Sequence, residues 1–323
     1  MPAPLLIADV PWLLYRAFFS LPKSIKGSDG RPVNALLGTV NALLSAIEAR
    51  PPRAVVACFG AEEAAYRVNL YSPYHAHRDP MPPALAEQWT RAPRLLESFG
   101  WTIADAHDLE ADDAMGSFAQ AEARSGGRAL LLTADRDLYQ AVDQRTAVLE
   151  MGKGATFAEL GPQQVLARYA IAPALVPDFI ALRGDPSDGL PGAPGIGAKT
   201  AAELLQAHGS LESVLAAAGA TAGAGGEAGG GSGAGTSGNA GGESAGGVDG
   251  GSAAGGEMRP RIAAALRENA ELLRTFKEIA TLVEIDVERP ADRATDFAGG
   301  ARGARELGME RLAKRLEGLA SAS

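Results

Sequence analysis

Four short apolar runs, separated by segments with helical periodicity, constrain the fold of this chain most strongly. They cover residues 5–8, 54–59, 128–133 and 146–150. Continuous apolar runs of this length are typical of strands that are buried on both faces of a parallel sheet. Because the runs alternate with helical segments, the sequence predicts an open α/β sheet whose ligands bind beyond the carboxyl ends of the strands.

Acidic residues gather where these runs end and in two further blocks. Asp9 closes the first run, and Asp135 and Asp137 follow the third. The complete set of candidate catalytic carboxylates is Asp9, Glu110, Asp112, Asp113, Asp135, Asp137, Asp185 and Asp188. Carboxylates that a fold brings together need cations to offset their mutual repulsion. The pattern therefore favours divalent metal chemistry.

Each acidic block also has a purely structural explanation. Residues 110–113 would occupy the first turn of a helix, where the helix dipole favours carboxylates. The acids at 135, 137, 185 and 188 are compatible with ordinary Asp-rich turns. Their joint occurrence along one chain favours the metal site over several independent coincidences.

Five separated motifs carry a family resemblance. They are Asp9 followed by Tyr15-Arg16, Glu-Ala-Asp-Asp at 110–113, Thr-Ala-Asp-Arg-Asp-Leu at 133–138, Gly-Asp-Pro-Ser-Asp-Gly-Leu-Pro-Gly at 184–192 and Gly-Ile-Gly-Ala-Lys-Thr-Ala at 195–201. In this order they resemble the 5′-3′ exonuclease family, the flap-endonuclease-like nucleases also found as the N-terminal domain of bacterial DNA polymerase I. The resemblance extends to about residue 290, apart from one insertion. It implies a PIN-like, mostly parallel sheet flanked by helices, followed by a helix–three-turn–helix DNA-binding domain.

The resemblance further implies hydrolysis of DNA phosphodiesters at 5′ flaps, nicks, branched or single-stranded 5′ ends, in replication or repair. Two Mg²⁺ or Mn²⁺ ions would bridge the scissile phosphate, activating a water and stabilising the leaving oxygen. By the same resemblance, the first ion is served by Asp9, Glu110 and Asp112, the second by Asp137, Asp185 and Asp188, with Asp135 between them and Asp113 outside the coordinating set.

Two positions depart from the family's pattern. Gly60 stands where the family typically has an aspartate after Phe59, so one metal ligand is missing, and Glu62 or Glu63 are the nearest substitutes. His75 replaces an arch lysine, so a titrating group replaces a permanent charge. The alternative to an enzyme is therefore a catalytically weakened flap- or junction-binding protein on the same scaffold. We expect Gly60→Asp to raise Mg²⁺-dependent activity.

Residues 66–100 are expected to form a mobile arch over the site. Cations alternate there with aromatic rings, a composition that suits a single strand. These residues are Arg67, Tyr71, Tyr74, Arg78, Trp89 and Arg91. The candidate DNA-binding residues include Arg16, Tyr74, His75 and Arg78. An alternative interpretation of Tyr71 and Trp89 is that they pack on the sheet. Pro80, Pro82 and Pro83 predict an irregular arch, or one ordered only on substrate.

The domain predicted over residues 161–290 is helical, with helices at 163–170, 175–183, 204–218 and 260–279. A glycine-rich turn at 192–197 leads into a further helix near Ala198 and exposes backbone amides that can hold a phosphate. The candidate duplex-DNA contacts are Gly195, Gly197, Lys199 and Thr200. The family resemblance adds a K⁺ ion at this turn. A rival interpretation, a PIN-like nuclease acting on RNA, is disfavoured because the turn suits a duplex DNA backbone.

Residues 219–257 hold 18 of the chain's 40 glycines and are predicted to be a disordered insertion, because they cannot bury enough apolar surface to order themselves. The remaining predicted units are an α/β nuclease core over 1–160 and a tail over 291–323 with one helix at 305–319. Because only this helix is predicted after residue 290, we expect no polymerase domain.

Composition narrows the class further. The single cysteine, Cys58, excludes an internal disulfide and a zinc-finger ligand set. No apolar run approaches 18 residues and no signal peptide is recognisable, so we expect a soluble cytoplasmic monomer without membrane association. The net charge of −9 is unusual for a nucleic-acid binder, but the acidic site and the insertion account for much of it.

Overall fold

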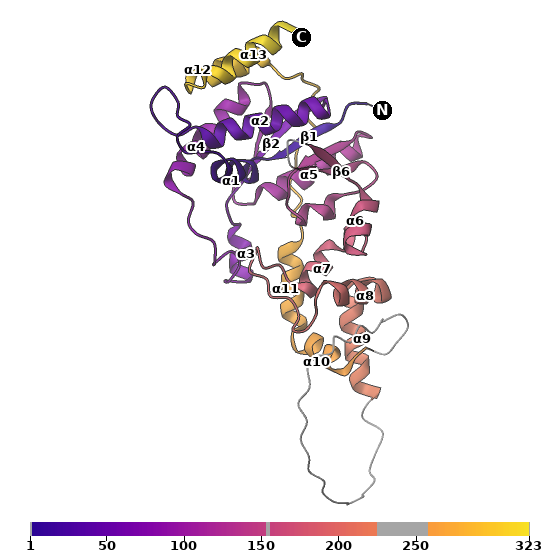
Figure 1. The fold of residues 1–323 in the computed structure, drawn as a ribbon. Coiled ribbons are helices and arrows are strands. Elements are labelled where there is room, and N and C mark those ends of the chain that lie inside the picture. Colours follow the sequence, from indigo (N-terminus) through magenta and orange to yellow (C-terminus); the bar gives the residue numbers. More distant parts are fainter. Residues whose placement is uncertain (1, 153–155, 225–257, 323) are drawn as a thin grey trace, which may run out of the picture.

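A six-stranded, mostly parallel sheet forms the centre of the molecule. The computed structural model describes residues 2–152, 156–224 and 258–322 (Figure 1). The strands are β1 Leu5–Asp9, β2 Ala54–Phe59, β3 Thr102–Asp105, β4 Ala129–Leu132, β5 Thr146–Met151 and β6 Phe157–Leu160. Their order is β3-β2-β1-β4-β5-β6, and only β6 runs antiparallel to its neighbour. The predicted α/β class and all four predicted strands are confirmed.

Helices cover both faces of this sheet. One face packs against α1 Val10–Ser20, α2 Asn34–Ala49 and α4 Pro83–Glu97, and the other against α5 Ala111–Arg124 (Figure 1). Side chains of β1 alternate between the two cores, with Leu6 and Ala8 on the first face and Leu5 and Ile7 on the second. This alternation explains why β1 has no polar side.

The carboxyl ends of the central strands lie level with one another. Asp9 is paired in register with Cys58, and Ala8 with Leu132. The residues that follow β1, β2 and β4 therefore meet at one edge of the sheet, as the sequence predicts for a parallel arrangement.

The arch is more ordered than predicted. It contains α3 Ala65–Leu70 and the whole of α4, and only residues 71–82 between them are irregular. The predicted break at the prolines is confirmed, because Pro83 is the first residue of α4, a position that needs no backbone N–H. The prediction of an irregular arch is wrong for α3 and α4.

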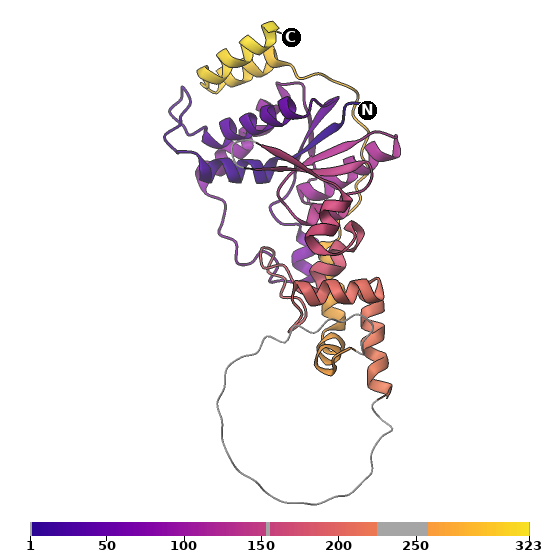
Figure 2. The same ribbon diagram turned by 45° about the vertical axis from the view of Figure 1, so that its right-hand side comes forward.

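Six helices form the part of the molecule that extends away from the sheet (Figure 2). They are α6 Pro162–Tyr169, α7 Val176–Arg183, α8 Ala198–His208, α9 Leu211–Ala224, α10 Pro260–Glu268 and α11 Ala270–Ala280. The helices predicted at 163–170, at 175–183 and from Ala198 are confirmed. The predictions of single helices at 204–218 and 260–279 are wrong, because Gly209, with φ +84°, ends α8 and Asn269 separates α10 from α11.

The predicted insertion begins later than its composition suggests. Residues 219–224 continue helix α9, so the prediction of disorder is wrong for these six. Residues 225–257 lie outside the described part of the chain, and the rest of the prediction falls on them.

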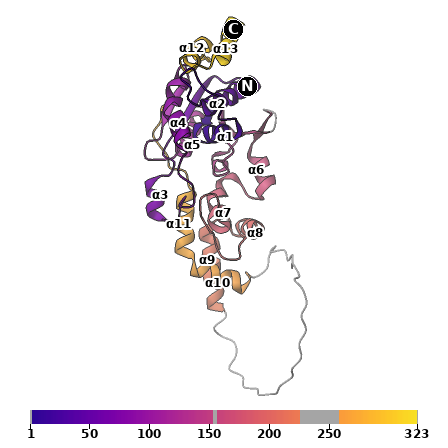
Figure 3. The same ribbon diagram turned by 60° about the vertical axis from the view of Figure 1, so that its left-hand side comes forward.

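The C-terminal tail forms a helical hairpin, α12 Phe297–Glu306 and α13 Glu310–Ala322, at the end of the molecule opposite α10 (Figure 3). The prediction of one helix over 305–319 is wrong because the chain turns at Gly308, whose φ of +68° suits glycine. Close approach to α4 also explains the small residues of α12. A Cβ at Gly300 would lie 2.3 Å from the Phe99 ring.

A buried ion-pair cluster fastens the segment before this hairpin to the sheet layer. Glu122 of α5 is 1% exposed and accepts hydrogen bonds from Arg53, which precedes β2, and from Arg289. Arg53 also donates to the Pro290 carbonyl over 2.7 Å. Burial alone would raise the pKa of Glu122, but the two arginines hold it below its usual value.

Within the described residues, no single helix is long and apolar enough to span a membrane, although the bent pair Pro162–Tyr169 and Pro173–Arg183 passes that test jointly by length and composition.

Glu122→Gln should lower the free energy of unfolding by about 3 kcal/mol at neutral pH, because it leaves two arginines without their buried partner. Since the pKa of Glu122 is lowered by folding, its contribution is present above the unfolded pKa and disappears as pH falls through the folded pKa. Denaturant unfolding between pH 7 and pH 3 measures both effects.

The matched control is Glu284→Gln, whose partner Arg124 is equally exposed at 59% of its side-chain surface. Glu284→Gln should lower the free energy of unfolding by less than about 1 kcal/mol. Equal losses in the two variants would contradict the role assigned to the buried cluster.

Candidate active site

A cavity of about 910 Å³ opens at the carboxyl edge of the sheet. Six of the eight predicted carboxylates line it: Asp9, Glu110, Asp112, Asp135, Asp137 and Asp188. They come from the end of β1, the start of α5, the segment after β4 and the loop after α7. The structure thus brings together carboxylates that are up to 179 residues apart, from Asp9 to Asp188.

Asp9 is held rigidly at the bottom of this arrangement. Its Oδ1 caps α1 by accepting from the Trp12 amide over 2.9 Å, and its Oδ2 accepts from the Thr133 hydroxyl over 2.8 Å. Burial raises the pKa of Asp9 to about 6, although these two hydrogen bonds oppose the rise. Thr133 opens one of the five motifs, but no role in the site was predicted for it; its place directly after β4 was the available signal.

Asp135 and Asp137 are presented by one tight turn. The Asp135 amide donates to the Thr133 hydroxyl, and the Asp137 amide donates to Asp135 Oδ1, both over 2.9 Å. The pKa values of Asp112 and Asp137 are raised well above their usual range. Desolvation is the largest cause and repulsion from Asp135 is the second. The turn thus explains the spacing of Asp135 and Asp137. Crowding leaves these two carboxylates with negative charge that no cation balances among the described residues.

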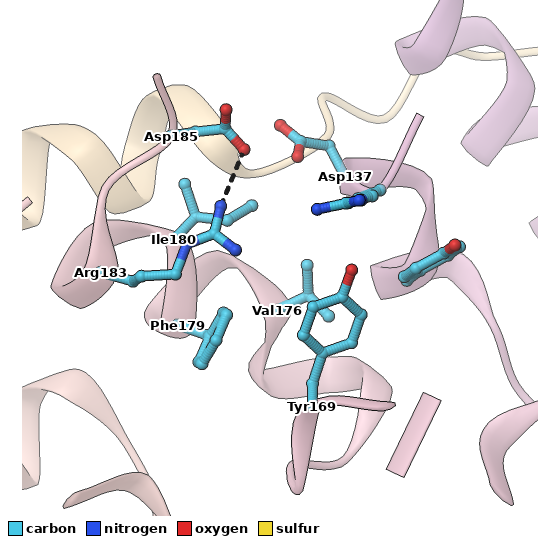
Figure 4. A pocket seen from close by; sticks show the side chains of 9 residues that line it. Asp137, Tyr169, Val176, Phe179, Ile180, Arg183 and Asp185 are labelled. Carbon is cyan, nitrogen blue, oxygen red and sulfur yellow. Dashed lines mark hydrogen bonds and ion pairs between the residues drawn. The ribbon is translucent and has the colours of Figure 1, made fainter. Parts of the chain in front are cut away.

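Asp185 faces Asp137 across a small recess beside the main cavity. Figure 4 shows their two carboxylates directed toward each other. Asp185 Oδ1 accepts from the Ser187 amide over 2.9 Å and Oδ2 accepts from Arg183 over 3.3 Å. Asp185 is therefore fixed in its loop with one side turned to Asp137.

Glu110 and Asp113 share a buried arginine from the arch. Arg67 is 3% exposed, pairs with both oxygens of Asp113 over 2.8 and 3.1 Å, and lies 3.1 Å from Glu110 Oε2. Asp113 also accepts from the Val283 amide and does not line the cavity. Arg67 also lines the cavity, but its guanidinium is engaged in this network, and its contact with single-stranded DNA stays a prediction.

The irregular arch segment docks onto the loop that carries Asp188. His75 Nε2 lies 3.1 Å from Asp188 Oδ1, Arg78 donates to the same oxygen over 3.0 Å, and the His75 amide donates to the Asp188 carbonyl. His75 is buried with a left-handed φ of +54°, and its Nδ1 has no partner among the described residues. Tyr74 donates to Glu110 and stacks on His75 with 3.9 Å between ring centroids.

An aromatic wall adjoins the carboxylates. It consists of Trp12, Tyr15 and Phe19 on α1 and Trp89 on α4, all of which line the cavity. Tyr15 and Phe19 stack with centroids 6.3 Å apart, and Phe19 is 67% exposed. Trp89 also meets Phe59 edge-on at the end of β2, whereas Tyr71 packs on Phe276 of α11. Tyr15 and Trp89 were already named in the sequence, and the helical spacing of Trp12, Tyr15 and Phe19 was the signal for the rest of the wall. Arg16, on the exposed side of α1, lies over Trp12.

Gly60 has no room for the aspartate of the family's pattern. A Cβ there would lie 2.5 Å from the Leu109 carbonyl oxygen and 2.6 Å from the Ala111 amide nitrogen. The end of β2 thus packs directly on the backbone that enters α5. Glu62 and Glu63 do line the cavity, and Glu62 accepts a hydrogen bond from Tyr15.

The glycine-rich turn before α8 forms a separate surface. Gly195, with φ +79°, and Gly197 are exposed, and a Cβ at either would meet nothing within 4 Å. Buried Ala193 and Ile196 anchor the turn from beneath. Lys199 is 73% exposed in the first turn of α8, beside the half-buried Thr200. Free space in front of a helix N-terminus suits an anion such as phosphate.

The residues around the cavity fit divalent cations by the chemistry of their donors. All the crowded groups are carboxylates, and hard cations such as Mg²⁺ prefer oxygen ligands. Among the described residues, no three such side chains converge into a complete ligand set. Oxygen-rich sites of this kind rely on water and substrate oxygens for the remaining positions.

A parallel sheet with carboxylates along one edge, an arch above them and a following helical unit defines the class of PIN-like nucleases. Residues 4–170 match the family described as 5′-3′ exonuclease, N-terminal resolvase-like domain. Residues 171–229 match the 5′-3′ exonuclease, C-terminal SAM fold. The chain belongs to the 5′-3′ exonuclease family.

Known proteins of similar sequence agree with this membership, and a solved structure agrees with the fold. A 5′-3′ exonuclease of Mycobacterium tuberculosis is 38% identical over 239 residues, 68% of this chain and 74% of that protein. The thermostable DNA polymerase I of Thermus thermophilus is 39% identical over 210 residues, 65% of this chain but 25% of the polymerase. A flap endonuclease of bacteriophage T5, in a pseudo-enzyme–product complex with DNA and metal ions, aligns over 98% of this chain and 99% of that chain with a TM-score of 0.61 and 14% identity.

Gly60→Asp should destabilise the protein by about 1–3 kcal/mol and lower any nuclease activity, because the new Cβ displaces the backbone before α5. This expectation reverses the one drawn from sequence, where the added carboxylate was expected to raise activity. Gly60→Ala is the control, since it adds the Cβ without the charge. Thermal unfolding should show similar losses in both variants. A stable and more active Gly60→Asp protein would disprove the steric argument.

Proposed function

We propose that this protein is a structure-specific 5′-3′ exonuclease and 5′-flap endonuclease that hydrolyses DNA phosphodiesters with two divalent ions, in DNA replication or repair. The observation that carries the proposal is the meeting of six carboxylates from four separate chain segments in one cavity. No structural explanation of the individual acids accounts for this convergence. Membership of the 5′-3′ exonuclease family supports the same reaction.

The residues assigned to each ion are those that the family resemblance implies. Asp9, Glu110 and Asp112 would hold the first ion, Asp135 would lie between the ions, and Asp137, Asp185 and Asp188 would hold the second. When bound, such ions activate a water and stabilise the leaving oxygen of an in-line displacement. Mg²⁺ is the proposed ion, with Mn²⁺ as a substitute.

The chain's own groups orient the substrate around these ions. Thr133 and the Trp12 amide fix Asp9, so its carboxylate needs no reorganisation. The aromatic wall offers faces on which unpaired bases of a 5′ end stack, since base stacking on aromatic side chains tolerates any sequence. Arg78, 45% exposed at the cavity mouth, is placed to meet a phosphate.

Duplex DNA would bind at the turn before α8, through the exposed backbone of Gly195 and Gly197 and the charge of Lys199. The proposed K⁺ ion would lie between this turn and a phosphate. We further propose that the protein acts as a cytoplasmic monomer on flaps, nicks and branched or single-stranded 5′ ends.

A second candidate function is flap or junction binding with weakened catalysis. It rests on the contacts that already occupy the Glu110 carboxylate. Arg67, Tyr74 and the Ala64 amide all engage its carboxylate, and Gly60 contributes no replacement. A cleavage assay on a 5′-flap duplex with Mg²⁺ or Mn²⁺ distinguishes the candidates. Turnover supports the nuclease, whereas tight binding without cleavage under either ion supports the second function.

Asp135→Ala should reduce flap cleavage by about a hundredfold or more, since even groups outside the coordinating set of a metal site cost 10–100-fold. DNA affinity, measured by fluorescence anisotropy in Ca²⁺, should change little, because the turn before α8 grips the duplex. Glu48→Ala, on the exposed side of α2, is the control and should cleave normally. An Asp135→Ala protein as active as wild type would refute the metal assignment.

Lys199→Ala should weaken DNA binding equally for all sequences and lower the slope of log affinity against log salt by about one unit. Lys314→Ala, on the exposed side of α13, should leave the slope unchanged. Titrations of a nicked duplex from 50 to 200 mM salt provide the comparison. Equal slopes in all three proteins would remove Lys199 from the DNA interface.

A further inference from the structure

Arg183 occupies an unusual position next to the second group of proposed metal ligands. It is the last residue of α7 and lines the small recess together with Asp137 and Asp185. Figure 4 shows its guanidinium below Asp185, joined to that carboxylate by a dashed line, with Asp137 on the far side of Asp185. A permanent cation thus stands beside two of the carboxylates proposed to hold the second ion, in a recess that Arg136 also lines.

Three contacts hold this guanidinium in place. Arg183 Nη2 lies 3.3 Å from Asp185 Oδ2, and Nε donates to the Gly184 carbonyl over 2.9 Å. The guanidinium carbon lies 5.3 Å from the centroid of the Phe179 ring, within the range of a cation–π interaction. The side chain is 20% exposed, and it also benefits from the negative end of the α7 dipole. Arg183 is therefore not a mobile surface residue.

We propose that Arg183 is a built-in counter-ion that competes electrostatically with the second divalent ion. It offsets the repulsion between Asp137 and Asp185 while no divalent ion is bound, and so keeps both carboxylates in place. The same charge lowers the affinity of the finished site for a divalent cation. This inference rests on the proposed two-ion function, and it deepens that function by naming a residue that sets metal affinity.

The opposite role, simple mechanical support of Asp185, makes the reverse prediction. If Arg183 only holds the loop, its removal loosens Asp185 and weakens metal binding. If its charge competes with the ion, its removal strengthens metal binding. The sign of the change therefore separates a counter-ion from a support.

The test is Mn²⁺ binding to the full-length protein without DNA, followed by isothermal titration calorimetry and by electron paramagnetic resonance of free Mn²⁺. Arg183→Gln should lower the dissociation constant of the weaker Mn²⁺ site about tenfold, the effect of one unit charge a few ångströms from a divalent ion in a high-dielectric site. Arg183→Lys keeps the positive charge but loses the planar, forked guanidinium, and it should bind Mn²⁺ as tightly as wild type does.

Thermal unfolding gives a second readout. Without metal, Arg183→Gln should melt below wild type because the carboxylates lose their counter-ion. With saturating Mn²⁺ the difference in Tm between Arg183→Gln and wild type should disappear. The rise in Tm caused by Mn²⁺ is therefore larger in the variant. Arg305→Gln is the matched control, since Arg305 pairs with Glu317 in the C-terminal hairpin and does not line the recess; it should leave Mn²⁺ binding unchanged.

Weaker or unchanged Mn²⁺ binding in Arg183→Gln overturns the inference, as does a loss of affinity in Arg183→Lys. Failure of the underlying function has a different signature. Wild-type protein would then show fewer than two Mn²⁺ sites, which overturns the two-ion assignment together with the inference built on it.

Discussion

Repulsion among the carboxylates at one edge of the sheet is the interaction on which the rest of this structure depends. The fold offsets it unevenly. Three of the outer carboxylates have an arginine within 3.3 Å: Glu110 with Arg67, Asp188 with Arg78 and Asp185 with Arg183. Within the described part of the chain, the inner carboxylates have no arginine this close, and burial and crowding raise the pKa values of Asp9, Asp112 and Asp137. The centre of the cavity therefore keeps the unbalanced charge that draws in a divalent ion, while the rim is neutralised well enough to fold without one.

Arg67 shows how the same electrostatic demand connects distant parts of the chain. Besides pairing with Asp113, it donates to the Ile279 carbonyl at the end of α11 over 3.0 Å. Asp113 in turn accepts from the Val283 amide over 2.8 Å. One buried network thus joins the base of the arch, the start of α5 and the segment that returns from the helical part of the molecule. Through Arg67, the end of α11 is thus linked to Glu110 by direct contacts.

The sequence predicted the elements whose signals are local. Apolar runs identified β1, β2, β4 and β5, but the edge strands β3 and β6 are four residues long and only partly buried, so they lack such a run. Helix ends set by one residue, such as Gly209 and Asn269, were missed because the apolar period continues across them. The meeting of Asp9 with Asp135 and Asp137 followed from their positions after parallel strands, whereas the burial of Arg67 did not, because it depends on Asp113 and Ile279, which come from other elements. Whether each acid holds a metal stays a prediction.

The two departures from the family's pattern are best understood as a pair. Relative to that pattern, Gly60 removes one negative charge near the first group of ligands, and His75 removes one permanent positive charge from the arch. Together the two changes leave the net charge near the carboxylates almost unaltered. Either change alone would alter that net charge by one unit charge close to the crowded carboxylates. The geometry has adapted to both. Backbone before α5 fills the space of the missing aspartate side chain, and His75, shorter than lysine, sits buried against Asp188 in a backbone conformation that L residues rarely adopt. Restoring a single family residue would therefore disturb the balance of charge and packing that now holds the site together.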